Sequence, residues 1–332
     1  MRANTDWFLA SKWGVFVHYL ADVASNSNPV DLPPDDWNRR VDGFDVDGLA
    51  AQLEQMGAGY FILTLGQNSG FYLSPNATYD SIVGHVPSHC SQRDLVADLA
   101  AAVIPRGIRM MVYFTAGAPC LDRRAIEALK CTPPWDPHLL GFHPEMYTAQ
   151  PGVDDRMTEF QTMWEAVIRE WSDRWGESVS GWWIDGCYVA DKMYRNPDAP
   201  NFASFAAAMK SGNPASIVAF NPGVMVPVIC HTEFEDYTAG EIANALPVSV
   251  GWHGVREPLG RYVDGAQYHI LTFLGHMWGQ GEPRFCDETV IGYTRDLIRD
   301  EGVISWDVPT SVTGLIPGAH VAQLTALGRA TR

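Results

Sequence analysis

Basic residues are scarce in this sequence. Its 332 residues include 23 Lys and Arg against 39 Asp and Glu, which gives a formal net charge of −16 at pH 7. Nucleic acids and anionic membrane surfaces bind proteins through clusters of basic side chains. The charge balance therefore argues against both classes of partner and favours an uncharged substrate.

Cysteine pairs and metal-binding motifs are also rare. The six cysteines lie far apart and form no C-x-x-C pair, so we expect free thiols and neither a disulfide framework nor a zinc knuckle. His138, His143 and His231 are scattered along the chain. We therefore predict that the protein has no metal site and needs no cofactor.

Three further signals are missing. No apolar run approaches the roughly 20 residues of a membrane span, and the first seven residues contain no apolar signal core, so we expect a cytoplasmic protein. The G-x-S-x-G turn of a serine hydrolase does not occur. His18, Tyr19 and Leu20 stand where a dinucleotide-binding fold would place its glycine-rich turn.

The sequence does contain an alternation of apolar strands and amphipathic helices. The predicted strands cover residues 13–20, 60–65, 110–115, 179–185, 216–220, 226–234, 268–273 and 303–308, and the predicted helices cover residues 45–57, 91–107, 154–175, 202–210 and 289–299. Such strands indicate a parallel sheet buried on both faces. We predict an α/β fold, a single (β/α)8 TIM-type barrel domain over residues 1–332, with a doubly wound sheet as the alternative. Residues 116–153 lack a clear period, which is typical of a functional loop or lid.

Asp185 ends a buried strand in the run V-S-G-W-W-I-D-G-C-Y. A carboxylate among apolar groups is costly unless it is paired or caps a helix, and both structural roles are open. Other predicted strands also end in polar residues, namely His18, Gln67, Asn68, Asn221 and the acidic residues Glu233 and Glu235. In a barrel these ends converge on one face, so one catalytic pocket would explain them together.

Carboxylates and aromatic rings at a barrel mouth are what a glycosidase needs. Trp182 and Trp183 alternate across their strand, so one of them faces the barrel interior. We include Trp183 among the candidate sugar contacts, with core packing as the alternative. Trp252 and Trp278 stand in loop-like contexts and are candidate sugar contacts as well.

Six segments, taken in order, resemble the α-L-fucosidases of glycoside hydrolase family 29. Residues 7–20, W-F-L-A-S-K-W-G-V-F-V-H-Y-L, are similar to the family's W-F-x-x-A-K-F-G-x-F-I-H-W-G, and residues 57–71 to its G-A-K-Y-x-V-L-T-A-K-H-H-D-G-F. Shorter likenesses follow at residues 92–99, 182–186, 236–241 and 277–279. The resemblance implies that Asp185 is the nucleophile of a retaining reaction. It also implies that Glu241 is the acid/base, with Glu233 and Glu235 as alternatives.

The sequence departs from the family at the sugar-binding positions. The family's paired histidines fall on Gln67 and Asn68, and the tryptophan after its histidine falls on Tyr19. Amides still donate to and accept from sugar hydroxyls, so a sugar site is compatible with them, while the identity of the sugar stays open. We also expect no β-sandwich after the barrel, because the sequence ends soon after its last predicted strand.

We therefore predict a retaining glycoside hydrolase whose partner is a carbohydrate or glycoconjugate. His18, Tyr19, Gln67, Asn68 and Asn221 would bind the sugar. Two other functions are left open: a sugar-modifying or transglycosylating enzyme of a biosynthetic pathway, and a non-catalytic carbohydrate-binding relative. Whether the chain forms a homo-oligomer is also left open.

Overall fold

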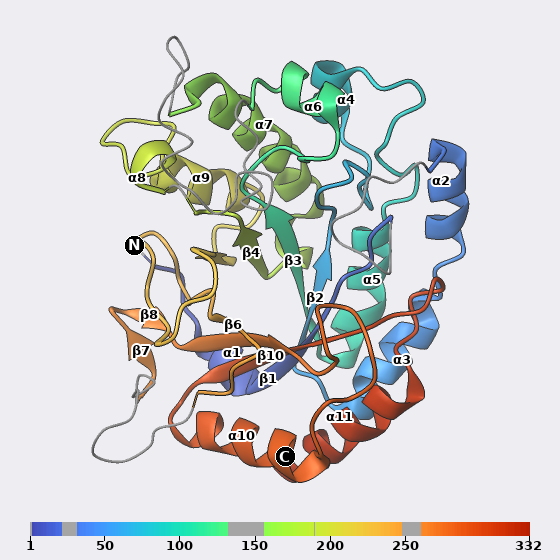
Figure 1. Cartoon of the computed structure of the whole chain (residues 1–332), viewed down its shortest axis with the longest axis vertical. Coiled ribbons are helices and arrows are strands. Elements are labelled where there is room, and N and C mark those ends of the chain that lie inside the picture. The colour runs from blue at the N-terminus through green and yellow to red at the C-terminus, as the bar shows by residue number, and fades with distance from the viewer. Residues whose placement is uncertain (1, 22–31, 132–155, 189, 248–259) are drawn as a thin grey trace.

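Eight parallel strands form the centre of the molecule (Figure 1). The computed structural model describes residues 2–21, 32–131, 156–188, 190–247 and 260–332. Around the sheet the strands follow the order β5-β4-β3-β2-β1-β10-β9-β6. Their bounds are β1 Trp13–Val17, β2 Tyr60–Thr64, β3 Arg109–Thr115, β4 Gly181–Asp185, β5 Ile217–Phe220, β6 Glu241–Ala243, β9 His269–Phe273 and β10 Val303–Val308. This arrangement confirms the predicted (β/α)8 TIM-type fold.

Helices lie outside the sheet and cover its outer face (Figure 1). The longer ones are α3 Val46–Met56, α5 Leu95–Val103, α7 Thr158–Trp175, α9 Phe202–Met209, α10 Asp287–Arg299 and α11 Gly318–Thr331. The remaining elements are α1 Asp6–Ser11, α2 Pro34–Asp42, α4 Ala77–Val83, α6 Arg123–Ala128, α8 Ala190–Met193 and the antiparallel pair β7 Tyr262–Val263 and β8 Ala266–Gln267. As the sequence predicts, Asp45 caps α3 through the Gly48 N–H, and Gly57 ends it in the left-handed conformation.

The strand alternation separates two packed layers. Trp183 lies inside the barrel with Phe16, Tyr113 and Leu271, whereas Trp182 points outward and packs against Trp175 of α7 at a ring distance of 5.7 Å. The predicted alternation of the two tryptophans is therefore confirmed. Because the period of a strand is two, Asp185 shares the inward phase of Trp183.

The two outermost strands of the sheet, β5 and β6, are joined through Asp236. Its backbone N–H donates to the Val218 carbonyl of β5 at 2.8 Å. Its carboxylate accepts the Val218 N–H at 2.8 Å and the Ala3 N–H at 2.6 Å, and it pairs with the Lys210 ammonium at 2.6 Å. One buried carboxylate thus connects the chain's amino end, α9, β5 and the approach to β6.

The structure differs from the sequence prediction in one strand and in several helices. The predicted strand over residues 226–234 is wrong, because these residues form no strand and the sixth barrel strand is β6. Pro227 lacks the N–H that a ladder requires, and Val226 and Ile229 are 41% and 38% exposed. Helices α1, α2, α4, α6, α8 and α11 were not predicted. Of the predicted loop or lid over residues 116–153, residues 123–128 form α6, and residues 132–153 lie outside the described residues.

Candidate active site

A cavity opens at the carboxyl ends of the barrel strands. Together with the open solvent at its mouth, its volume is about 300 Å³. It is lined by Phe16, His18, Gln67, Tyr113, Trp183, Asp185, Glu241, Leu271 and Trp278. A larger hollow lies at the opposite end of the barrel, where Arg109 begins β3 and Ala215 precedes β5. Barrel enzymes carry out their chemistry at the carboxyl ends, so the smaller cavity is the candidate active site.

Asp185 lies in this cavity at the end of β4 and accepts three side-chain hydrogen bonds. Its Oδ2 accepts from the Tyr113 hydroxyl at 2.6 Å, and its Oδ1 accepts from the Tyr188 hydroxyl at 3.2 Å and from Asn221 Nδ2 at 2.8 Å. These donors come from β3, from the turn after β4 and from the end of β5. They fix both oxygens of the carboxylate in place.

Asn221 joins the two predicted catalytic carboxyl groups. The same Nδ2 that donates to Asp185 also donates to Glu241 Oε2 at 2.6 Å. The two accepting oxygens are therefore no farther apart than the sum of the two distances, about 5.4 Å. Burial and the neighbouring Asp185 charge raise the pKa of Glu241 to about 7. The cavity thus holds two adjacent carboxyl groups, one of which keeps a proton near neutral pH.

Gln67 and Tyr113 form a relay toward Asp185. Gln67 Nε2 donates to the Tyr113 hydroxyl at 2.6 Å, and that hydroxyl donates onward to Asp185. The Tyr113 ring stacks on Trp183 with centroids 5.3 Å apart. The Gln67 Oε1 atom is buried and has no partner among the described residues. A hydroxyl group of a ligand could donate to it.

His18 lines the cavity in a fixed orientation. Its Nδ1 lies 2.8 Å from Asp307 Oδ1, and the other Asp307 oxygen accepts the Gly279 N–H at 2.6 Å. Burial raises the pKa of the Asp307 carboxyl, whereas His18 and the Gly279 N–H oppose the shift. Trp278 lies beside His18 with ring centroids 5.8 Å apart. This anchoring leaves Nε2 as the ring nitrogen that can face a ligand.

The structure brings seven of the predicted residues together: His18, Gln67, Trp183, Asp185, Asn221, Glu241 and Trp278. Tyr19 points away from the cavity, because its hydroxyl donates to the Val312 carbonyl at 2.6 Å and its ring packs on Phe44. Asn68 is buried outside the cavity lining. Trp252 lies outside the described residues.

The two alternative acids also lie outside the cavity lining. Glu233 is exposed. Glu235 is fully buried, and its carboxylate accepts the His231 N–H at 2.6 Å and the Phe220 N–H at 3.3 Å. Burial raises the pKa of Glu235 to about 8. Its contacts hold the loop before β6 against β5, so the geometry favours Glu241 over both.

Three further residues of the site were not among the predicted ones. Tyr113 and Tyr188 donate to Asp185, and Asp307 orients His18. Tyr113 could have been found from the sequence, because it stands on the inward phase of its strand with a hydroxyl group. Tyr188 follows Asp185 by three residues and depends on a turn that the sequence does not determine.

Comparisons with known proteins identify the family and similar folds. The family model of the alpha-L-fucosidases matches residues 31–252. No curated protein matches the sequence at a significant level. Among solved structures, an endo-fucoidan hydrolase of glycoside hydrolase family 107 has a TM-score of 0.68 at 16% identity; the match covers 98% of this chain and 53% of that one. The chain therefore spans about half the length of that relative.

Two fucosidase structures are also similar. One is a bacterial fucosidase with a monovalent iminocyclitol inhibitor, with a TM-score of 0.64 and 17% identity over 99% of this chain and 75% of that one. The other is a family 29 alpha-L-fucosidase from Bacteroides thetaiotaomicron, with a TM-score of 0.62 and 16% identity over 99% of this chain and 75% of that one. At these identities the likeness establishes the fold alone.

Proposed function

The chain belongs to the alpha-L-fucosidase family, and from this premise we propose that it is a retaining glycoside hydrolase acting on α-L-fucosides or closely related sugars. Asp185 is the nucleophile and Glu241 the acid/base. The substrate is a carbohydrate or glycoconjugate, as the family suggests. The proposal rests on the cavity at the barrel mouth and on the chemistry of the side chains that line it.

The observation that carries the proposal is the shared amide of Asn221. Retaining glycosidases hold their two carboxyl groups about 5–5.5 Å apart, and inverting enzymes about 6.5–9.5 Å apart, because a water molecule must fit between. The upper bound of about 5.4 Å between the oxygens that Asn221 holds supports the retaining course.

The reaction follows from the different environments of the two carboxyl groups. Asp185 attacks the anomeric carbon with an oxygen that Tyr113 or Asn221 releases from its hydrogen bond. Glu241 is protonated below its pKa of about 7, so it donates that proton to the leaving oxygen. The resulting Glu241 carboxylate then takes a proton from water, which hydrolyses the glycosyl–Asp185 bond.

The structural relatives support a covalent intermediate. The Bacteroides fucosidase was trapped as a covalent intermediate with 2-fluoro-fucosyl fluoride in a variant with one glutamate changed to glutamine. By analogy, Glu241→Gln in this chain is the variant that accumulates an intermediate on Asp185. Around the sugar, Gln67 Oε1 accepts from one hydroxyl group, His18 Nε2 accepts from or donates to another, and Trp278 packs on the apolar ring face.

The experiment compares the wild-type protein with Asp185→Asn on 4-nitrophenyl α-L-fucoside and on a panel of other nitrophenyl glycosides. We expect hydrolysis of the fucoside and a loss of at least about 10³-fold in kcat for Asp185→Asn. Asp173→Asn on the exposed face of α7 is the matched control and keeps full activity. Proton NMR of the first-formed sugar should show the anomeric configuration of the substrate.

Three outcomes would contradict parts of the proposal. Full activity of Asp185→Asn would show that Asp185 is not the nucleophile. A first product of inverted anomeric configuration would show that the mechanism is not retaining. Activity on a different glycoside alone would keep the mechanism but remove fucose as the sugar.

A further inference from the structure

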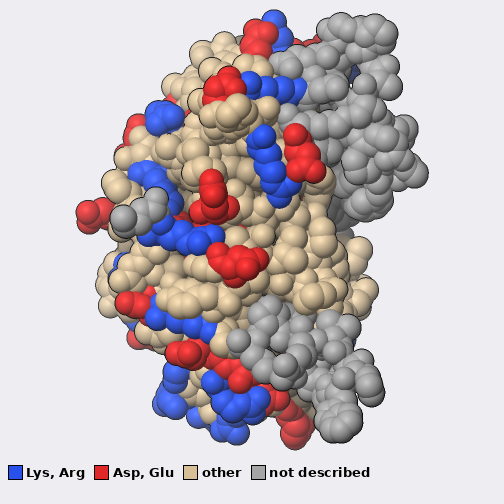
Figure 2. Space-filling view, turned by 90° about the vertical axis from the view of Figure 1, so that its left-hand side faces the viewer, with Lys and Arg blue, Asp and Glu red and all other residues tan. Residues whose placement is uncertain are grey.

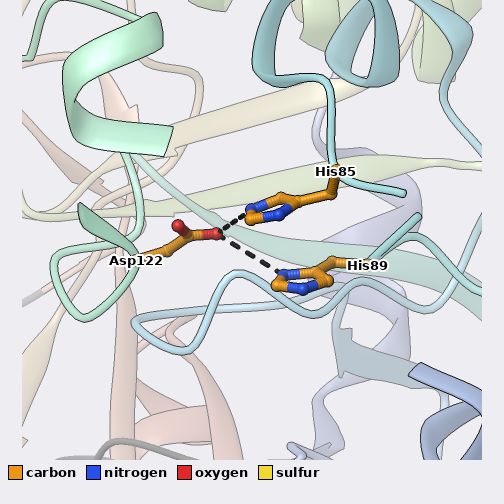
Figure 3. A group of neighbouring side chains, drawn as sticks. All are labelled: His85, His89 and Asp122. Atoms are coloured by element: carbon orange, nitrogen blue, oxygen red, sulfur yellow. Dashed lines mark hydrogen bonds and ion pairs between the residues drawn. The ribbon is translucent and has the colours of Figure 1, made fainter. Parts of the chain in front are cut away.

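A second group of chemically reactive side chains lies outside the candidate active site. Figure 3 shows His85, His89 and Asp122 converging on one point. His85 Nε2 lies 2.7 Å from Asp122 Oδ2, and His89 Nδ1 lies 3.5 Å from the same oxygen. The potential ligand atoms of the three residues all lie within 4.8 Å of one another.

The spacing of two histidines in the sequence indicates this group, although the sequence prediction was that no metal site exists. His85 and His89 are four residues apart in the segment H-V-P-S-H, between α4 and α5. Asp122 is 33 residues beyond His89 and caps α6, accepting the Ala125 N–H on Oδ1 at 3.1 Å. Only the fold brings the carboxylate to the two imidazoles, so the sequence alone does not reveal the third ligand.

The spacing of the ligand atoms is close to what a small divalent metal ion requires. Tetrahedral zinc with ligand bonds of about 2.0–2.2 Å keeps its ligand atoms roughly 3.3–3.5 Å apart. The His89–Asp122 distance already fits, and the His85–Asp122 distance must open by less than 1 Å. The two imidazole rings stack with centroids 3.6 Å apart and planes 13° apart, so the His85 ring must turn before both nitrogen lone pairs point at one ion.

The residues around His85, His89 and Asp122 restrict how these side chains can move. The His89 Nδ1 atom is covered and makes no hydrogen bond with any described residue. Phe71 stacks on the His89 ring at 4.3 Å, which fixes its plane. Asp122 is 7% exposed, while His85 and His89 are 15% and 19% exposed. Solvent can therefore reach the histidines and supply the fourth ligand as a water molecule.

Arg124 is a cationic side chain near this group. Arg124 opposes a cation, but its guanidinium donates to the Val83 and Gly84 carbonyls.

We propose that His85, His89 and Asp122 bind one divalent transition-metal ion, with Zn²⁺ as the ion that two imidazoles and one carboxylate suit. The role is structural. The Leu121 N–H donates to the Asn68 carbonyl at 2.9 Å, and a Cβ on Gly70 would lie 2.8 Å from Asp122 Oδ2. The metal would therefore tie the segment before α5 to the loop that carries Gln67.

The test is metal binding, measured without reference to glycosidase activity. The full chain is stripped with EDTA, dialysed against Zn²⁺, and analysed for bound zinc by atomic emission. We expect one Zn²⁺ per chain and a rise in Tm on adding zinc. Co²⁺ in place of Zn²⁺ should give the strong visible absorption of a four-coordinate site. His89→Gln and Asp122→Asn should each weaken zinc binding at least about tenfold.

His276→Gln is the matched control, because His276 is exposed and lies outside the group; it should bind zinc as the wild type does. The metal-free Tm and far-UV spectrum of each variant show whether it folds. A wild-type chain that binds no zinc or Co²⁺ would overturn the proposal, and the group would then be an ion pair that fastens the loop. Wild-type-like zinc binding by a folded His89→Gln would overturn it as well.

Discussion

At the scale of single residues, Asn221 determines how the two carboxyl groups of the site behave. Its one amide nitrogen bridges Asp185 and Glu241, so the Asp185 charge lies close to the Glu241 carboxyl group. Burial and the Asp185 charge disfavour ionisation of Glu241, which explains why its pKa rises to about 7. Burial first, and the charge of the neighbouring nucleophile second, therefore keep the acid of the proposed reaction protonated.

This coupling predicts the pH dependence of activity. Glu241 must be protonated to act as the acid, so we expect kcat/KM to fall about tenfold per pH unit above about pH 7. In Glu241→Gln the residual hydrolysis of an aryl fucoside with a good leaving group should lose that alkaline limb. The measurement is kcat/KM between pH 4 and 9 for both proteins. An unchanged alkaline limb in Glu241→Gln would assign it to another group.

The sequence could predict the residues whose position follows from the end of a strand. Asp185 and Asn221 end β4 and β5, and the parity of a strand fixes which side chains point inward. Tyr19 could not be placed in this way, because it lies two residues past β1, where the chain leaves the strand geometry. Its hydroxyl donates to the Val312 carbonyl and does not point into the cavity.

At the scale of elements, the caps of α3 and α5 offer a matched comparison. Asp45 accepts only the Gly48 N–H within its own helix start. Asp94 accepts the Ala97 N–H and also the Trp175 Nε1–H of α7, at 3.1 Å from both oxygens. The first residue caps one helix, whereas the second also connects two helices of the outer layer.

We expect Asp45→Ala to lower the free energy of unfolding by about 1 kcal/mol, the ordinary value of a cap. Asp94→Ala should cost about 2–3 kcal/mol, because it also leaves the Trp175 indole N–H unpaired. Urea denaturation followed by tryptophan fluorescence measures both. Equal losses in the two variants would show that the link to α7 adds nothing.

In each element that the sequence misplaced, the apolar pattern does not correspond to the structure that forms. The run Val226–Ile229 is apolar but includes Pro227, and of its side chains only Val228 is buried. The sixth strand is short and contains the catalytic candidate Glu241 itself, so it has no apolar run that could identify it. Helix α11 is rich in Gly, Ala and Thr, and only its packed positions, such as Leu324 and Leu327, mark a face.

At the scale of the whole molecule, one face of the surface carries charges of both signs. On the face in Figure 2, Lys and Arg side chains are interspersed with Asp and Glu side chains. Such a surface does not present the basic stripe that nucleic acids require. None of the helices that the structure describes is both long and apolar enough to cross a membrane.

The connection between β5 and β6 through Asp236 predicts how the barrel responds to a single truncation. Asp236→Ala leaves the Lys210 ammonium, which is 17% exposed, without its partner and removes the acceptor of two backbone N–H groups. Breaking such a buried pair typically costs about 3–5 kcal/mol. We expect urea denaturation to show a loss of that size.

Two further variants show how much of the loss in Asp236→Ala comes from leaving the Lys210 charge unpaired. Glu159→Ala removes a pair with Lys130 in which both side chains are more than half exposed, and it should change stability by less than about 1 kcal/mol. Lys210→Met combined with Asp236→Ala should recover part of the loss, because no unpaired buried charge is left. If Asp236→Ala cost no more than Glu159→Ala, Asp236 would not be the residue that joins β5 to β6.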